Sequence, residues 1–187
     1  MRNAPASEPV TIELEEALGL HAIDASVFAP FVIQRLKAGG NANDVELLVI
    51  IGSDKGQDER FLRVQIRWNP DNAFRLPVAV QERVVTEWAA LGVACALIPD
   101  ILGMRVLSVA LDGERYDYRI GNKQGEFGLE ISGTLTEDIG ELQERHRQKV
   151  RQLMENPFGV GGYVIVVGFV RHEALLTSHL SLLEETQ

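Results

Sequence analysis

Residues 163–170 read Tyr-Val-Ile-Val-Val-Gly-Phe-Val, an almost wholly apolar run without a charged side chain. β-Branched and aromatic residues dominate it, which favours a strand. Side chains alternate between the two faces of a strand, so a run that is apolar at every position must be covered on both faces. The stretch therefore predicts a central strand in a sheet with helices on both sides, which is an α/β fold.

The segment that precedes this strand predicts one of those helices. Between Glu137 and Glu155, apolar or weakly polar residues recur at spacings of three and four, as expected for one face of a helix. Asn156-Pro157 ends the pattern, since proline cannot continue a helix. The stripe consists of Ile139, Leu142, His146, Val150 and Leu153.

Further towards the N-terminus, two turn signals separate three short runs that read as strands. Asp112-Gly113 is a typical hairpin turn, and a second glycine-containing turn covers residues 121–125. Residues 104–132 are therefore predicted to form a three-stranded antiparallel meander. Its strands are Met104–Leu111, Tyr116–Ile120 and Phe127–Ser132.

Elements on either side complete this predicted core. Val78–Leu91 has helical spacing and Gly92 is expected to stop that helix. Val93–Ile98 then predicts a short strand, and His172–Leu183 a closing C-terminal helix.

The first 77 residues predict an extension on the core, after a flexible start at residues 1–9. Val10–Leu20 reads as a strand that leads into a short helix. A second helix is capped by Asp24 or Ser26 and ends at Gly39-Gly40. Val45–Ile51 and Phe61–Trp68 predict a β-hairpin. We expect this extension (10–77) and the core (78–187) to form one compact unit.

Composition narrows the class of protein. The chain has 187 residues, 45% of them hydrophobic, and a net charge of −9, whereas proteins that bind nucleic acid broadly carry an excess of lysine and arginine. Its single cysteine, Cys95, predicts no internal disulfide. No signal peptide or membrane span is expected, so the sequence predicts a cytoplasmic protein without a membrane partner. A local basic stretch lies at residues 145–151.

Two acidic residues lie on the predicted second and third strands of the meander. Asp117 stands in Tyr116-Asp117-Tyr118, and Glu130 in Leu129-Glu130-Ile131. Together with the order helix, three strands, helix, strand over residues 78–170, they resemble the core of the restriction-endonuclease-like, or PD-(D/E)XK, superfamily. The resemblance covers about half of the chain. It implies that Asp117 and Glu130 bind Mg²⁺ or Mn²⁺ for phosphodiester hydrolysis.

Strand alternation is compatible with such a site. Leu129 and Ile131 point to one face of the sheet, so Glu130 points to the other. Mg²⁺ takes oxygen ligands and keeps several waters, which two carboxylates that converge across a hairpin can accommodate. A bound metal ion would then activate water and offset phosphate charge.

The sequence departs from the family pattern where the lysine is expected. Ser132 occupies that position, two residues after Glu130. Members of the family sometimes supply the basic residue from the following helix, which here implies Lys149 as the catalytic base. Gln148 and Gln152 would then assist, and Arg145 and Arg147 would contact phosphate. Substituted motifs also mark inactive relatives in this family.

Other interpretations remain open at this point. Asp117 and Glu130 can be exposed hairpin carboxylates, or partners of Arg115 and Arg119. His146 is expected at the edge of the core. As an alternative function, the chain is a non-catalytic interaction module for a protein partner or a second copy of itself. Its docking surface would be the N-terminal segment with the hairpin at residues 45–68.

Overall fold

The computed structural model describes residues 8–37, 42–53, 59–71 and 80–180. These residues form an α/β fold with one eight-stranded mixed sheet of order β1-β3-β2-β8-β7-β6-β5-β4. The strands are β1 (Val10–Glu13), β2 (Asp44–Ser53), β3 (Arg60–Arg67), β4 (Arg105–Val109), β5 (Tyr118–Asn122), β6 (Gly125–Thr134), β7 (Gly162–Gly168) and β8 (Glu173–His179). The helices are α1 (Leu14–Leu18), α2 (Ala29–Leu36), α3 (Glu82–Leu102) and α4 (Ile139–Met154), with a 3₁₀ turn, η1 (Ala25–Phe28), before α2.

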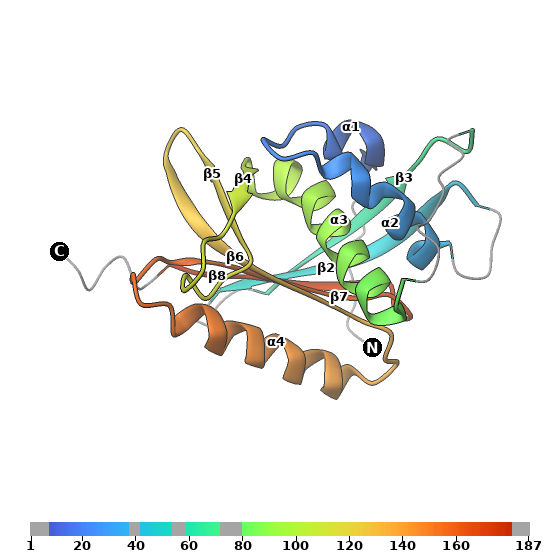
Figure 1. Cartoon of the computed structure of the whole chain (residues 1–187). Helices are drawn as coiled ribbons and strands as arrows, with labels where there is room; N and C mark the ends of the chain where they lie inside the picture. Colours follow the sequence, from blue (N-terminus) through green and yellow to red (C-terminus); the bar gives the residue numbers. More distant parts are fainter. Residues whose placement is uncertain (1–7, 38–41, 54–58, 72–79, 181–187) are drawn as a thin grey trace.

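The sheet has helices on both faces, as residues 163–170 predict. Figure 1 shows α1, α2 and α3 on one side of the sheet and α4 alone on the other. β7 is buried along its whole length between β6 and β8. Its odd-numbered residues, such as Ile165, join the large core under α3, whereas Val164 and Val166 join a smaller core under α4. The prediction of a central strand is confirmed.

The predicted meander is also confirmed. β4 pairs with β5, and β5 with β6, both antiparallel. α4 then crosses over to β7, which pairs with β6 in parallel. The helix begins where expected because the side chain of Asp138 accepts a hydrogen bond from the backbone of Gly140, at 2.8 Å. The observed order is α3-β4-β5-β6-α4-β7, with β8 antiparallel to β7.

The prediction that Gly92 stops a helix, and that Val93–Ile98 is a strand, is wrong. α3 runs through both, from Glu82 to Leu102. A Cβ atom at Gly92 would lie 2.4 Å from Val32 Cγ2 and 3.0 Å from Phe28 Cβ. Glycine is therefore needed where α3 passes close to α2, and the packing overrides its low helix propensity. The predicted start at Val78 lies outside the described residues.

The predicted C-terminal helix is wrong as well. Residues 173–179 form β8, which pairs with β7 on one side and with β2 on the other. Ala174 and Leu176 point into the core under α3. The strand therefore joins the N-terminal hairpin to the rest of the sheet.

The N-terminal extension belongs to this same sheet. The hairpin β2–β3 forms as predicted, and β1 pairs in parallel with β3. Asp24 caps η1 by accepting from Ser26 N, at 3.3 Å. The expected stop at Gly39-Gly40 and residues 1–7 lie outside the described residues.

One described helix, α3, is long and apolar enough to cross a membrane by length and composition alone, although the sequence led us to expect none. Within the fold, 67% of that apolar window is buried. Its apolar character is thus accounted for by its place between α1, α2 and the sheet.

Candidate functional site

The candidate site lies where β6 loses its neighbour β5. The pairing of β5 with β6 ends at Tyr118 and Leu129, followed by a hydrogen bond from Asp117 N to Leu129 O. Beyond this point the β6 backbone N–H groups need other acceptors. Ile131 N donates to Asp117 Oδ2, at 2.9 Å, and Gly133 N donates to Glu87 Oε2, at 3.3 Å. Carboxylates thus take the place of a strand at this edge.

Lys149 brings together the two carboxylates that the sequence singles out. Its Nζ lies 2.6 Å from Glu130 Oε2 and 3.3 Å from Asp117 Oδ2. Asp117 comes from the loop before β5, Glu130 from β6 and Lys149 from α4. Strand alternation places Glu130 on the face that α4 covers, as expected. We call these three residues the carboxylate–lysine cluster.

Glu130 is fully buried, with 0% of its surface exposed. Burial and the charge of Asp117 together raise its pKa to about 8, against the lowering effect of Lys149. Burial alone would lower the pKa of Lys149, but the two carboxylates raise it above its ordinary value. Glu130 therefore exchanges a proton near neutral pH, while Lys149 stays charged. The alternative of two exposed hairpin carboxylates is wrong.

One carboxylate oxygen of this cluster is buried without a hydrogen-bond partner in the described part of the chain. Among the described residues, three buried side-chain polar atoms have no hydrogen-bond partner: Glu130 Oε1, Arg145 Nε and Arg35 Nε. The first two belong to residues in or beside the cluster. Such atoms are costly to bury, so Glu130 Oε1 indicates a place where a ligand can supply the missing interaction.

Glu87 is a member of the site that the sequence analysis missed. Besides Gly133 N, it accepts a hydrogen bond from Ser132 Oγ, at 3.3 Å, and lies 3.9 Å from Arg145 Nη1. Arg145 also donates to Ser132 Oγ, at 3.3 Å. A spacing of four from Arg83 to Glu87 and on to Leu91 on one helix face is the signal that could have identified it.

A pocket of about 520 Å³ opens beside the cluster. α3 and α4 provide its cations, Arg83, Arg145 and Lys149, which face the carboxylates of Asp117 and Glu87. The remaining lining is mostly apolar or aromatic and comes from α3, β4, β5 and β6: Trp88, Leu91, Val109, Tyr118, Ile131 and Ser132. The pocket therefore joins a charged side to an aromatic side.

The other basic residues named from the sequence lie elsewhere. Arg147 is exposed on α4, where its Nη2 lies 2.7 Å from Glu144 Oε2. Gln148 and Gln152 are exposed and do not line the pocket. Arg145 is therefore the one predicted phosphate contact that the structure brings to the pocket, and Arg147 is not brought there.

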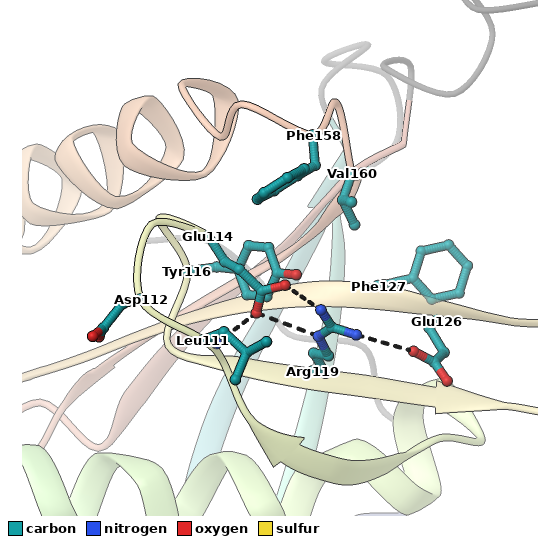
Figure 2. A pocket seen from close by; sticks show the side chains of 9 residues that line it. All are labelled: Leu111, Asp112, Glu114, Tyr116, Arg119, Glu126, Phe127, Phe158 and Val160. Carbon is teal, nitrogen blue, oxygen red and sulfur yellow. Dashed lines mark hydrogen bonds and ion pairs between the residues drawn. The ribbon is translucent and has the colours of Figure 1, made fainter.

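Arg115 and Arg119 do not pair with the cluster either. Arg115 Nη1 lies 3.3 Å from Glu155 Oε2. Arg119 forms an ion pair with Glu114 and lies 3.9 Å from Glu126. Figure 2 shows its guanidinium between these two carboxylates. The interpretation of Asp117 and Glu130 as their partners is wrong.

Figure 2 also shows a second pocket, of about 450 Å³, around Arg119. Figure 2 places Phe158 and Val160 above Arg119, with Tyr116 behind Glu114. Hydrogen bonds from Arg119 and from Leu111 N hold the pKa of Glu114 at about 2. Arg119, Glu114 and Glu126 therefore pair with one another in this pocket, whereas Glu130 Oε1 has no hydrogen-bond partner among the residues that the structure describes.

The carboxylate oxygens of the cluster can be compared with the ligands that a divalent metal ion requires. Among the described residues, no group of three or more His, Cys, Asp and Glu side chains is placed to hold a metal ion. Mg²⁺ needs only one or two protein carboxylates when substrate oxygens and waters complete its shell. Asp117 and the unpartnered Glu130 Oε1 fit that requirement. A preformed cage of protein ligands is not present in this part of the chain.

His146 and Cys95, which the sequence also singled out, are both held within the fold. His146 is half-buried, and its Nε2 lies 2.7 Å from Thr177 Oγ1 on β8. Burial lowers its pKa to about 4, so it stays neutral. Cys95 is fully buried in α3, and burial raises its pKa to about 12. The expected edge-of-core histidine is confirmed.

Comparison of the chain with models of protein families, with curated proteins and with solved structures gives no match.

Proposed function

We propose that the chain is a nuclease-like protein whose carboxylate–lysine cluster hydrolyses phosphodiester bonds with a divalent cation. The observation that carries the proposal is the geometry of Glu130. It is fully buried beside a second carboxylate and a lysine, yet one of its oxygens has no partner. Such an arrangement lowers stability and is typical of a functional site.

Each residue of the site has a role in this proposal. Asp117 and Glu130 would hold Mg²⁺ or Mn²⁺, which supplies an activated water and offsets charge on the phosphate. Lys149, 2.6 Å from Glu130, holds a proton close to the reacting oxygens. Arg145 lines the pocket beside the cluster and would contact a phosphate oxygen.

Hydrolysis forms one bond from water oxygen to phosphorus and breaks the bond from phosphorus to the leaving oxygen. One proton must pass from the water to that leaving oxygen. Lys149 stays charged, so it would donate this proton to the leaving oxygen instead of acting as the catalytic base that the resemblance implies. Asp117 would accept the proton of the water. The fold order α3-β4-β5-β6-α4-β7 and the place of the two acids support the resemblance to the PD-(D/E)XK superfamily.

One observation favours the second candidate, a non-catalytic interaction module. The ammonium group of Lys149 already bridges both carboxylates, as a structural ion pair would. The docking surface first considered for this candidate is less suitable. β3 and β2 are each paired on both sides, so the hairpin offers no free strand edge.

A cleavage assay tests the first candidate. We expect the protein to cut a labelled oligonucleotide with Mg²⁺ or Mn²⁺ and to stop when EDTA is added. Glu130→Gln, Asp117→Asn and Lys149→Met should each lower the rate by at least about 100-fold, as loss of a positioned proton-transfer or ligand group does.

Glu126→Gln provides a matched control for this assay. Glu126 is on the same strand and the same face as Glu130, but its side chain is 63% exposed and outside the cluster. This variant should cut at the wild-type rate. A wild-type protein that cuts neither DNA nor RNA with either cation would overturn the nuclease proposal and leave the interaction module.

A further inference from the structure

The pocket beside the cluster carries a feature that hydrolysis alone does not require. Trp88 of α3 lines it and is 40% exposed, although tryptophan is usually well covered. Its ring packs edge-on against buried Phe31, with ring centroids 4.9 Å apart at 83°. This contact fixes the indole while part of it stays open to the pocket.

The charges of the same pocket limit what it can bind. Duplex-binding proteins typically neutralise several phosphates with lysines and arginines. Here Arg83, Arg145 and Lys149 line the pocket, and Lys149 is already paired with two carboxylates. With a net charge of −9 over the whole chain, ionic contacts alone give little affinity for a duplex. Affinity must come from another source.

Base stacking is such a source. An unpaired base stacks on an exposed aromatic ring whatever its identity, whereas a base within a duplex is already stacked and out of reach. The pocket volume, about 520 Å³, lies within the roughly 300–1,000 Å³ range of small-molecule sites. It therefore has room for a single nucleotide.

We propose that the substrate is an unpaired nucleic-acid strand, with one base stacked on Trp88 and the adjoining phosphate against Arg145 and the carboxylate–lysine cluster. This inference rests on the proposed function, because it names the substrate of the same site. Ile131 and Ser132 of β6 line the same pocket, so the strand would pass along this edge, over the carboxylates that accept from its backbone N–H groups.

Binding without cleavage tests the inference directly. Labelled oligothymidylate and a duplex of equal length are titrated with the full chain in EDTA, and anisotropy is followed. We expect at least about tenfold tighter binding of the single strand. Trp88→Leu should weaken that binding by about tenfold or more, which is the loss expected for one stacked base.

Two variants control for correct folding and for non-specific binding of the oligonucleotide to exposed aromatic residues. Trp88→Phe keeps an aromatic ring against Phe31 and should bind within about threefold of wild type, since phenylalanine also stacks. Phe158→Leu removes another exposed aromatic residue, 66% exposed, from the second pocket and should bind as wild type. The only other tryptophan, Trp68, is 5% exposed, so quenching of tryptophan emission by the oligonucleotide should report on Trp88.

The outcomes separate this inference from the proposed function. Equal single-strand affinity of wild type and Trp88→Leu, or a preference for duplex, overturns the inference even if cleavage by the cluster is found. Trp88-dependent binding of the single strand without any cleavage supports the binding site and overturns the nuclease proposal instead. Trp88-dependent binding together with cleavage that Glu130→Gln abolishes supports both.

Discussion

Glu130 on β6 and Glu46 on β2 lie on the same face of one sheet, and each is hydrogen-bonded to a cation. Glu130 Oε2 lies 2.6 Å from Lys149, and Glu46 Oε2 lies 2.5 Å from Arg63. Their surroundings differ. The side chain of Glu46 is 48% exposed on β2, whereas that of Glu130 is fully buried on β6, against which α4 packs.

This difference in burial reverses the effect on the carboxyl group. Hydrogen bonds from Arg63 lower the pKa of Glu46, whereas burial raises the pKa of Glu130 to about 8 despite Lys149. An ion pair on the surface keeps most of its hydration, so it loses little free energy on folding. A buried pair loses the hydration of both charges, and the attraction between the partners does not fully offset that desolvation free energy. We infer that the Glu46 pair is a surface feature and that the Glu130 pair is kept for function.

Removing the buried cation should have the largest effect on stability. Lys149→Met leaves Glu130 and Asp117 without their cation, so at pH 9.5, where Glu130 of the wild type is ionised, the free energy of unfolding should fall by about 3–5 kcal/mol. At pH 5 the loss should be smaller, because Glu130 then takes up a proton. Urea unfolding at both pH values measures this, and an equal loss at the two would contradict the account of Glu130.

Replacing the buried carboxyl should have a smaller effect of the opposite sign. The pKa of Glu130 is raised in the folded state, so between about pH 4.5 and pH 8 the unfolded chain has released a proton that the folded chain keeps. Stability is therefore fully present below this range and is lost as pH rises through it. Glu130→Gln escapes that loss and should be more stable than wild type at pH 8, by roughly 2–4 kcal/mol.

Thermal unfolding of both proteins between pH 5 and pH 8.5 checks this prediction. The difference in stability should grow steadily with pH, because only the wild type loses stability at this position. Parallel curves, or a less stable Glu130→Gln at pH 8, would show that Glu130 is ionised in the folded protein.

The exposed pair should give the smallest effect. Glu46→Gln removes a carboxylate that solvent already screens, so its cost in unfolding free energy should be several-fold below that of Lys149→Met. High salt should abolish even this cost. If Glu46→Gln lowered the free energy of unfolding as much as Lys149→Met does, and salt did not change this loss, the contrast between the exposed Glu46 pair and the buried Glu130 pair would be wrong.

The predictable parts of the fold are those that local pattern controls. Apolar runs, alternation and turn residues predicted the meander and the central strand β7. Gly92 led to a wrong prediction of a helix end. It is needed because α2 passes close to α3 at this point, and that contact joins segments far apart in sequence. Residues 173–179 contain helix-forming Glu, Ala and Leu, but pairing with β2 and β7 makes them a strand.

The same limit applies to the site. Strand alternation separated Glu130 from Leu129 and Ile131, and the family resemblance implied Lys149 of the following helix as part of its site. The burial of Glu130 depends on how closely α4 lies over β6, which no local pattern encodes. Glu87 was missed because helical spacing shows only which face of α3 it lies on, whereas its contacts with Ser132 and Gly133 of β6 join segments far apart in sequence.

The central claim is that Glu130 and Asp117 form a cation-binding centre, and calorimetric titration with Mn²⁺ tests it most directly. Glu130 is mostly protonated at pH 7 and must lose its proton to bind a metal ion. We therefore expect binding that releases about one proton at pH 7, found by comparing two buffers of different ionisation enthalpy, and less at pH 9. Glu126→Gln should bind like wild type and Glu130→Gln should not bind. No binding by wild type, or undiminished binding by Glu130→Gln, would contradict the claim.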